Sequence, residues 1–145
     1  MGHMSAEVLD SRLNARLPRR VKEGLAGLAR RRHVDESELA RTLLDEGLRR
    51  EKHPGIVFRN TPTGREAAIE GRRLYVWQVM ETVWASDGDT AQAADYLGIR
   101  PDQVDTAVGY FADHRVEIEE LIALNQEEAR RGMDQAKRRK QVRRR

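Results

Sequence analysis

Three polar residues near the start of the chain, Arg12, Asn14 and Arg16, have side chains suited to reading DNA bases. Arginine can donate two hydrogen bonds to O6 and N7 of guanine, and asparagine can pair in a similar way with N6 and N7 of adenine. Because the three residues alternate along the chain, an extended segment would place their side chains on one face. The spacing predicts a strand that presents these three polar side chains on one face. The alternative is that these side chains only solvate the exposed face of a sheet.

Basic residues gather at both ends of the chain, although the net charge of its 145 residues is only +3. Residues 5–52 contain 12 Lys/Arg and 9 Asp/Glu, and residues 130–145 contain 9 Lys/Arg and 1 Asp/Glu. Residues 53–129 contain 6 Lys/Arg and 14 Asp/Glu, which is the wrong sign for binding phosphate. The distribution therefore predicts that contacts with nucleic acid involve the ends of the chain.

Local patterns before residue 53 indicate one strand followed by two helices. In residues 11–17, apolar side chains alternate with polar ones, which is the period of a half-buried strand. Pro18 suits the first position of a helix over residues 18–32, since its missing N–H would have no partner there. Asp35 and Glu38 form a capping-box pattern that opens a second helix, extending to about residue 51. The apolar positions are Leu13, Ala15 and Leu17 in the strand, Val21, Leu25, Leu28 and Ala29 in the first helix, and Leu39, Ala40, Leu43, Leu44 and Leu48 in the second.

This arrangement requires a second chain. A lone strand leaves its backbone N–H and C=O groups without partners, and two short helices bury too little apolar surface to be stable alone. Antiparallel pairing of the strands of two chains would meet both needs. The sequence therefore predicts a homodimer or a higher oligomer.

Strand, helix and helix within residues 11–52, with Pro18 and Asp35 in this order, resemble the ribbon-helix-helix family of bacterial DNA-binding proteins, which includes VapB-like antitoxins. The resemblance implies an intertwined dimer whose paired strands enter the major groove of operator DNA, with the alternating Arg and Asn side chains on the base edges. It also implies a phosphate contact at the start of the second helix. Ser37 is the candidate there, because Asp35 and Glu36 bring negative charge to that end.

The break at residues 53–55 opens a second region with a different pattern. It indicates two short strands joined by a turn and then three helices, of which the last two have the spacing of a helix-turn-helix. The exposed positions of its would-be recognition helix include three carboxylates, which DNA phosphates would repel, so we interpret this unit as a small folded core. The expected strands are residues 56–60 and 65–69, and the expected helices are residues 75–85, 90–97 and 101–112. The exposed positions are Asp102, Gln103, Asp105, Thr106 and Asp113, and the candidate core residues are Val76, Trp77, Val79, Met80, Val83, Trp84, Val104, Val108, Tyr110 and Phe111.

A second resemblance covers roughly residues 53–121. His-Pro-Gly-Ile at residues 53–56 and Gly-Arg-Arg-Leu-Tyr-Val-Trp at residues 71–77, ahead of the three helices, resemble a small helix-turn-helix-like antitoxin domain encoded beside PIN-like toxin genes. The resemblance implies an antitoxin role without identifying the residues that contact a toxin.

Together these patterns predict a mainly α-helical protein in three parts. Residues 5–52 form a ribbon-helix-helix domain for DNA binding and dimerisation. Residues 53–125 form a small winged-helix-like, helix-turn-helix-like antitoxin domain. Residues 126–145 form a basic, flexible tail.

The tail has too little apolar surface to be held in place, so we expect it to fray from about residue 126 without a partner. It is a solvated tail, a nonspecific nucleic-acid segment or a toxin-binding segment. The family resemblance implies the last of these, because PIN-type toxins resemble metal-dependent ribonucleases with a cluster of acidic ligands. In that role Met133 would anchor the segment, and Arg138 or Arg139 would reach the acidic site.

Other classes of function find no support in the sequence. The histidines at His33, His53 and His114 are scattered singly, and no cysteine is present, so a disulfide framework and a thiolate metal site are excluded. No catalytic constellation, cofactor motif or metal site is expected. No signal peptide is visible and no apolar run approaches the roughly 20 residues that span a membrane, so we expect a cytoplasmic protein. Residues 2–4 are interpreted as a cloning remnant and are left out of the fold.

The function predicted from these features is the antitoxin of a type II toxin–antitoxin pair. It binds operator DNA as a dimer, represses its own operon and neutralises a PIN-type ribonuclease toxin. The alternatives are a free-standing ribbon-helix-helix transcriptional repressor and an interaction protein that binds no DNA.

Overall fold

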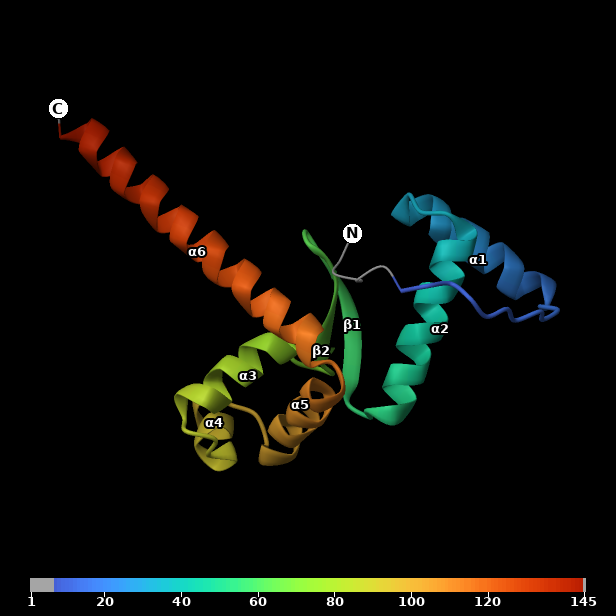
Figure 1. The fold of residues 1–145 in the computed structure, drawn as a ribbon, viewed down its shortest axis with the longest axis horizontal. Helices are drawn as coiled ribbons and strands as arrows, with labels where there is room; N and C mark the ends of the chain where they lie inside the picture. The colour runs from blue at the N-terminus through green and yellow to red at the C-terminus, as the bar shows by residue number, and fades with distance from the viewer. Residues whose placement is uncertain (1–6, 145) are drawn as a thin grey trace. The chain divides into compact units, whose positions relative to one another are not determined.

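The computed structural model describes residues 7–144. The first six residues, including the segment interpreted as a cloning remnant, and the last residue of the basic tail lie outside the described part. The described chain is mainly helical, with one two-stranded sheet (Figure 1). It divides into a unit that ends at Pro54 and a unit that begins at Gly55. Each unit is described by itself.

The first unit consists of an extended segment and two helices. Residues 7–18 have no regular secondary structure, and their side chains are exposed. Helix α1 (Arg19–Arg32) follows Pro18 and ends at His33, whose left-handed backbone (φ 55°) turns the chain. Helix α2 (Glu36–Lys52) begins after Asp35, whose carboxylate accepts hydrogen bonds from the backbone N–H groups of Ser37 and Glu38. The two predicted helices and the cap at Asp35 are therefore confirmed, whereas no reciprocal bond from the Glu38 side chain completes a capping box and Pro18 lies one position before the helix.

The prediction of an N-terminal strand, and with it the ribbon-helix-helix fold, is wrong. The two-stranded sheet of the described chain lies between α2 and α3, not before α1. The alternation of apolar and polar residues in 11–17 indicates only which side chains would share a face of a strand. A strand also needs a neighbouring backbone, and no other described segment pairs with these residues. Residues 56–69 contain two strands and their own turn, and a short loop closes at small entropic cost.

The second unit opens with an antiparallel hairpin. Strands β1 (Ile56–Thr61) and β2 (Gly64–Ile69) pair from Ile56 opposite Ile69 to Thr61 opposite Gly64, as the turn residues predict. The buried ends of these strands lie at the base of the hairpin, because Ile56 and Ile69 are both within the core.

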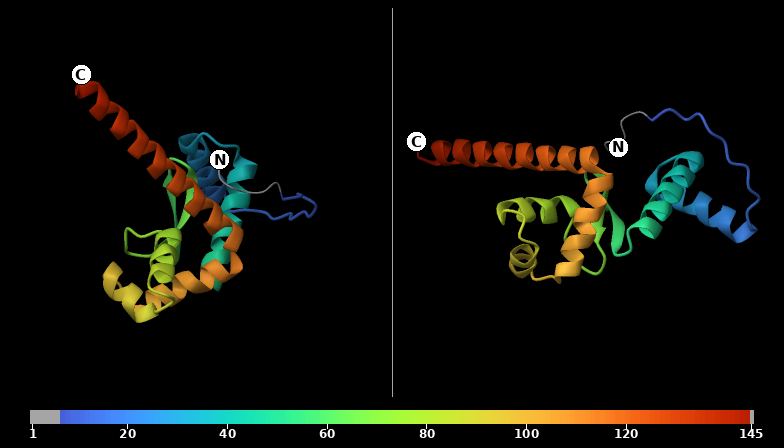
Figure 2. Two further views of the ribbon diagram at one scale, coloured as in Figure 1. Left: turned by 60° about the vertical axis from the view of Figure 1, so that its left-hand side comes forward. Right: turned by 60° about the horizontal axis from the view of Figure 1, so that its bottom comes forward.

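Three short helices complete the core of this unit (Figure 2). They are α3 (Val76–Ala85), α4 (Thr90–Leu97) and α5 (Pro101–Asp113). Asp89 caps α4 by accepting a hydrogen bond from Gln92 N–H, and Gly98 ends it in the left-handed conformation (φ 69°). The fully or almost fully buried side chains include Val76, Val79, Met80, Ala93, Val104, Ala107 and Tyr110.

The last helix, α6 (Arg115–Arg143), has a buried root and a long exposed end. Ile118, Leu121 and Ile122 are buried in the core, and beyond them α6 runs out past the other elements of its unit (Figure 1). The sequence predicts fraying from about residue 126, whereas the helix continues unbroken to Arg143. Good helix formers and ion pairs between successive turns stabilise such a segment without tertiary packing.

None of the described helices combines the length and the apolar character needed to cross a membrane.

Candidate functional site

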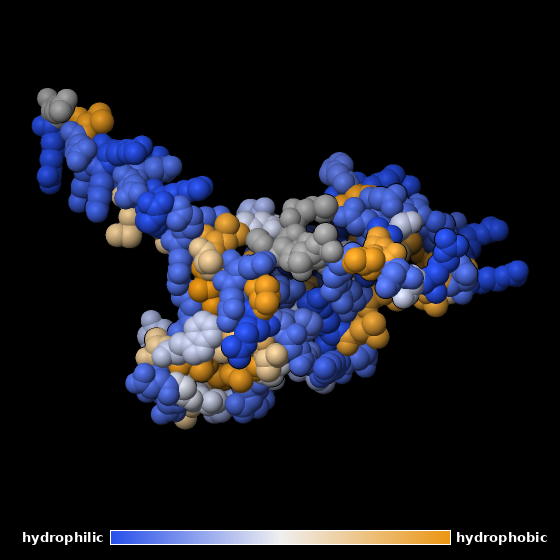
Figure 3. Space-filling model, in the orientation of Figure 1, coloured by the Kyte–Doolittle hydropathy of each residue, from blue (hydrophilic) through white to orange (hydrophobic). Residues whose placement is uncertain are grey.

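The exposed end of α6 is rich in charged side chains. Every residue from 128 to 143 is exposed. Figure 3 shows this part of the molecule as a hydrophilic projection with a few apolar side chains. Among the apolar residues is Met133, whose residue surface is 64% exposed. The segment has a helical backbone, and its side chains are exposed along its whole length.

Ion pairs within α6 divide its cations into two groups. Glu127 accepts hydrogen bonds from Arg130, at 2.6 Å between Nη2 and Oε1, and from Arg131, and Arg130 also pairs with Asp134. The hydrogen bond from Arg130 lowers the pKa of Glu127 below its ordinary value. The cations of α6 after Asp134 have no such partner within the described part of the chain. These are Lys137, Arg138, Arg139, Lys140 and Arg143.

The three tail residues singled out from the sequence are all exposed, but they do not share one helix face. At 100° per residue, Arg138 and Arg139 lie roughly 140° and 120° from Met133, on opposite sides. Lys137 and Lys140 lie within roughly 40° of Met133 instead. One face of the exposed end therefore combines Met133 with two lysines, and the two arginines flank the far side.

The N-terminal candidates lie in the extended segment before α1. Arg12, Asn14 and Arg16 are exposed, and neither arginine has a hydrogen bond or ion pair within the described residues. Their guanidinium groups are therefore available to a phosphate or a base edge.

Ser37 lies in the first turn of α2, as predicted, but its backbone N–H already has a partner. It donates to Asp35 Oδ2 at 3.0 Å. A phosphate at this helix end would have to displace that carboxylate, so Ser37 can contribute its hydroxyl more readily than its amide.

The α4–α5 pair has an acidic outer surface. Asp102 and Asp105 are exposed on α5, where a recognition helix would need neutral or basic side chains. Arg100 forms a two-point contact with Asp102, at 3.0 and 3.3 Å, and the hydrogen bond lowers the pKa of that carboxyl. The arginine at the start of α5 is thus already paired with one of these carboxylates.

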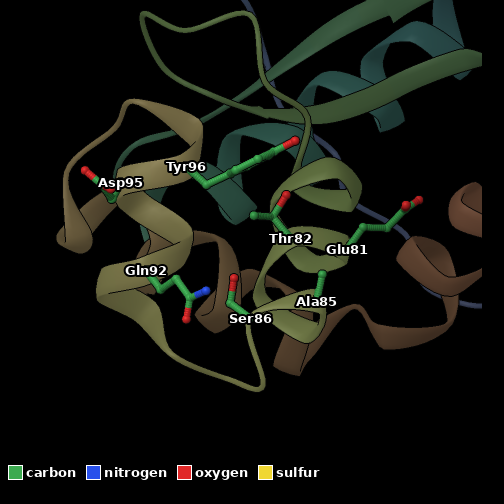
Figure 4. Close-up of a pocket in the computed structure, with 7 residues that line it drawn as sticks. All are labelled: Glu81, Thr82, Ala85, Ser86, Gln92, Asp95 and Tyr96. Carbon is green, nitrogen blue, oxygen red and sulfur yellow. The ribbon is translucent and has the colours of Figure 1, made fainter.

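A hollow of about 600 Å³ lies between α3 and α4, and no sequence motif indicated it. Figure 4 shows Thr82 on α3 and Ser86 directly after it between the helices, Tyr96 extending across them, and the carboxylates of Glu81 and Asp95 at opposite ends. It arises where two short helices pack at an angle, which spacing along the chain does not reveal. The remaining lining residues are Ala85 and Gln92.

Two buried polar contacts serve the fold rather than a site. Glu66 is buried and accepts hydrogen bonds from Trp77 Nε1 at 3.0 Å and from the Thr63 hydroxyl at 3.2 Å. The buried Tyr110 hydroxyl donates to Glu117 Oε2 at 2.7 Å, which ties α5 to the root of α6. No group of three His, Cys, Asp or Glu side chains within residues 7–144 is arranged to hold a metal ion.

Comparison of the chain with models of protein families, with curated proteins and with solved structures found no match.

Proposed function

We propose that this chain is the antitoxin of a type II toxin–antitoxin pair, and that the exposed end of α6 binds and neutralises the toxin. The observation that carries the proposal is a helical segment with five cations that have no partner in the described chain and almost no packing of its own. Such a segment gains little stability from its own fold, and an acidic partner would give it both charge pairs and buried surface.

The toxin class follows from the family resemblance in residues 53–121. A PIN-type ribonuclease carries a cluster of acidic metal ligands, and an arginine inserted there competes with the metal for those carboxylates. Arg138 and Arg139 are exposed and carry no internal pair, so either can make that contact. Met133 supplies an apolar anchor on a different face of the same helix, so the toxin would contact more than one side of α6.

The first unit supports a second part of the proposal, which is pairing with a copy of itself. Its buried apolar residues are only Ala29 and Leu39 among the described residues, which is too small a core for an independent unit of this size. Several large apolar side chains of the unit are exposed instead, and a second copy that presents the same side chains would cover them. They include Leu13, Leu17, Val21, Leu43, Leu44 and Leu48.

Dimerisation would bring two copies of the exposed basic segment together for operator DNA. Arg12 and Arg16, followed by Arg19 and Arg20 at the start of α1, form a run of cations that can follow a phosphate backbone and reach base edges. We propose that this segment supplies the DNA contact of an autorepressor. Arg12→Ala with Arg16→Ala should weaken operator binding by about 1–3 kcal/mol for each arginine that hydrogen-bonds to a base. Unchanged operator affinity of that double variant would contradict this role.

The toxin-binding role is tested by growth rescue. The full-length chain is co-expressed with the product of the adjacent gene, and Arg138→Gln with Arg139→Gln is compared with the matched pair Arg72→Gln with Arg73→Gln. All four arginines are exposed, so both variants remove the same charge from the surface. Loss of rescue and of co-purification in the α6 variant alone supports the proposal.

Full rescue by the α6 variant would contradict it. If the adjacent gene product is not toxic and does not co-purify with the chain, while operator binding persists, the chain is a free-standing repressor.

A further inference from the structure

We propose that the hollow between α3 and α4 is a docking surface for the exposed end of α6 from a second copy of this chain. The interaction is head to tail, because the two surfaces that meet are different parts of the molecule. It is separate from the apolar pairing of the first unit and does not depend on the identity of any toxin.

The hollow is lined by negatively charged side chains, whereas the exposed end of α6 is mainly positively charged. Glu81 and Asp95 lie at its two ends, and neither has a hydrogen bond or ion pair within the described residues (Figure 4). Between them, Tyr96 is 81% exposed and offers a broad apolar and aromatic surface. A ligand that fits carries at least two separated positive charges with an apolar group between or beside them.

Ser86 adds a hydroxyl group to the lining of the hollow. Ser86 is only 9% exposed, yet its hydroxyl makes no hydrogen bond with any described residue. No buried side-chain nitrogen or oxygen of the described residues lacks a hydrogen bond, so this hydroxyl keeps access to solvent and can accept a hydrogen bond from a group that enters the hollow.

The exposed end of α6 carries the matching groups on one face. Met133 lies on the same side of the helix as Lys137 and Lys140, and neither lysine is paired within the described chain. Met133 can pack against the ring of Tyr96, and sulfur–aromatic contacts of this kind are favourable. Lys137 and Lys140 can then pair with the carboxylates of the hollow or donate a hydrogen bond to a hydroxyl.

An α6 tail that occupies the hollow must come from another copy because α6 is continuous. Ile122 is its last buried residue, and Lys137 follows 15 positions later, about 22 Å further along the axis. A helix without a break cannot turn back over its own unit, and α6 runs outward from it (Figure 2). The tail of one chain can therefore reach only the hollow of a neighbour.

Docking of this kind would hide Met133 and the lysine face of each tail. A partner that uses the same face would have to compete with it. The contact is made mainly of exposed charges, so it is weak and strongly dependent on salt.

The experiment is zero-length cross-linking of carboxylates to lysine amines in an equal mixture of isotopically heavy and light full-length chains. We expect peptides that join Lys137 or Lys140 to Glu81 or Asp95, including pairs of one heavy and one light peptide. Purely heavy–heavy and light–light pairs in a fully exchanged mixture would place the contact within one chain and overturn the proposal. The absence of these cross-links would overturn it as well.

Sedimentation velocity of the full-length chain supplies a second measurement. Raising NaCl from about 0.1 M to about 1 M shortens the screening length from about 10 Å to about 3 Å. We expect the association constant for head-to-tail assembly to fall about tenfold or more over this range. Assembly that is unchanged by salt would contradict the proposal.

Two neutralised variants make the test specific. Glu81→Gln with Asp95→Asn removes the charge of the hollow, and Lys137→Gln with Lys140→Gln removes the charge of the tail. Neither variant alone should assemble head to tail, and mixing the two should restore a pair, because each retains the half that the other lacks. The control Asp105→Asn with Glu119→Gln removes two exposed carboxylates elsewhere and should assemble normally.

Failure of mixing to restore assembly would overturn the proposal. It would leave toxin neutralisation untouched, since growth rescue is measured separately.

Discussion

Replacing Tyr110 by phenylalanine tests whether the root of α6 is held by a polar contact as well as by packing. The Tyr110 hydroxyl donates a 2.7 Å hydrogen bond to Glu117, and the tyrosine is fully buried. The substitution removes one oxygen atom and keeps the ring, so the edge contact with Phe58 at 6.2 Å and the stacking with His114 at 4.4 Å are preserved. Any decrease in stability then reflects mainly the hydrogen bond.

The expected decrease follows from the chemistry of the acceptor. A hydrogen bond to a charged group contributes about 1.5–3 kcal/mol to the free energy of unfolding. Glu117 is half-buried, so water replaces part of the missing donor, and we expect about 1.5–2 kcal/mol. For a unit of this size the melting temperature falls about 4–8 °C per kcal/mol, which gives a decrease of roughly 6–16 °C.

Urea unfolding followed by tryptophan fluorescence measures this decrease, because both tryptophans of the chain, Trp77 and Trp84, lie in the unit that begins at Gly55. The matched control is Tyr96→Phe, which removes the same atom from an exposed tyrosine without a described hydrogen bond. We expect the control to differ from the unaltered chain by less than about 0.5 kcal/mol. Equal unfolding free energies for the two variants would refute the reasoning.

Three further predictions concern other interactions. Trp77→Phe removes the hydrogen-bond donor to the buried Glu66 and should lower the free energy of unfolding by about 1–3 kcal/mol, as measured by thermal or urea unfolding. An unchanged unfolding midpoint would show that water replaces the missing donor. Leu44→Ser with Leu48→Ser should raise the dimer dissociation constant in sedimentation equilibrium by at least about tenfold, because burial of each leucine contributes about 1.5–3 kcal/mol, and a monomeric unaltered chain would refute the pairing. The lowered pKa of Glu127 means that its contribution to helix stability is fully present above the ordinary glutamate pKa of about 4.3 and disappears as the pH falls through the lowered value. Carbon chemical shifts of residues 127–134 should report that decrease in helix content at acid pH, and Glu127→Gln should not show the same step.

Local rules predicted most of the helical elements of the chain because their signals are contained within a few residues. The cap at Asp35 and the turn before Gly64 act through bonds to their own neighbours, so no knowledge of the rest of the fold is needed. The strand expected in residues 11–17 is different, because a strand exists only beside another backbone. Alternation indicates which side chains would face together but does not supply that partner.

The core was predictable in type but not in detail. Val104 and Tyr110 are fully buried as expected, whereas Trp84 is 47% exposed and Val108 lies at the surface. Apolar character alone does not give the direction of a side chain on a short helix, which depends on how that helix meets its neighbours. Trp84 contacts the core residue Phe111 with the two rings nearly perpendicular, at a centroid distance of 5.4 Å. The hollow between α3 and α4 depends on the same packing and could not be inferred from spacing.

The exposed apolar surface of the first unit and the charged surfaces of the second unit should respond to salt in opposite ways. Salt can therefore be used to separate their roles experimentally. An interface that buries the exposed leucines of the first unit would be apolar. Its affinity would not be weakened by salt screening and would be strengthened by sulfate. The cations at the end of α6 and the carboxylates beside the α3–α4 hollow would form ion pairs that 1 M NaCl largely removes. As the NaCl concentration is raised, the head-to-tail assembly should therefore dissociate first and the dimer of the first unit should remain intact. If both assemblies dissociate together, one surface serves both, and the division of the chain into an apolar pairing unit and an ionic docking unit is incorrect.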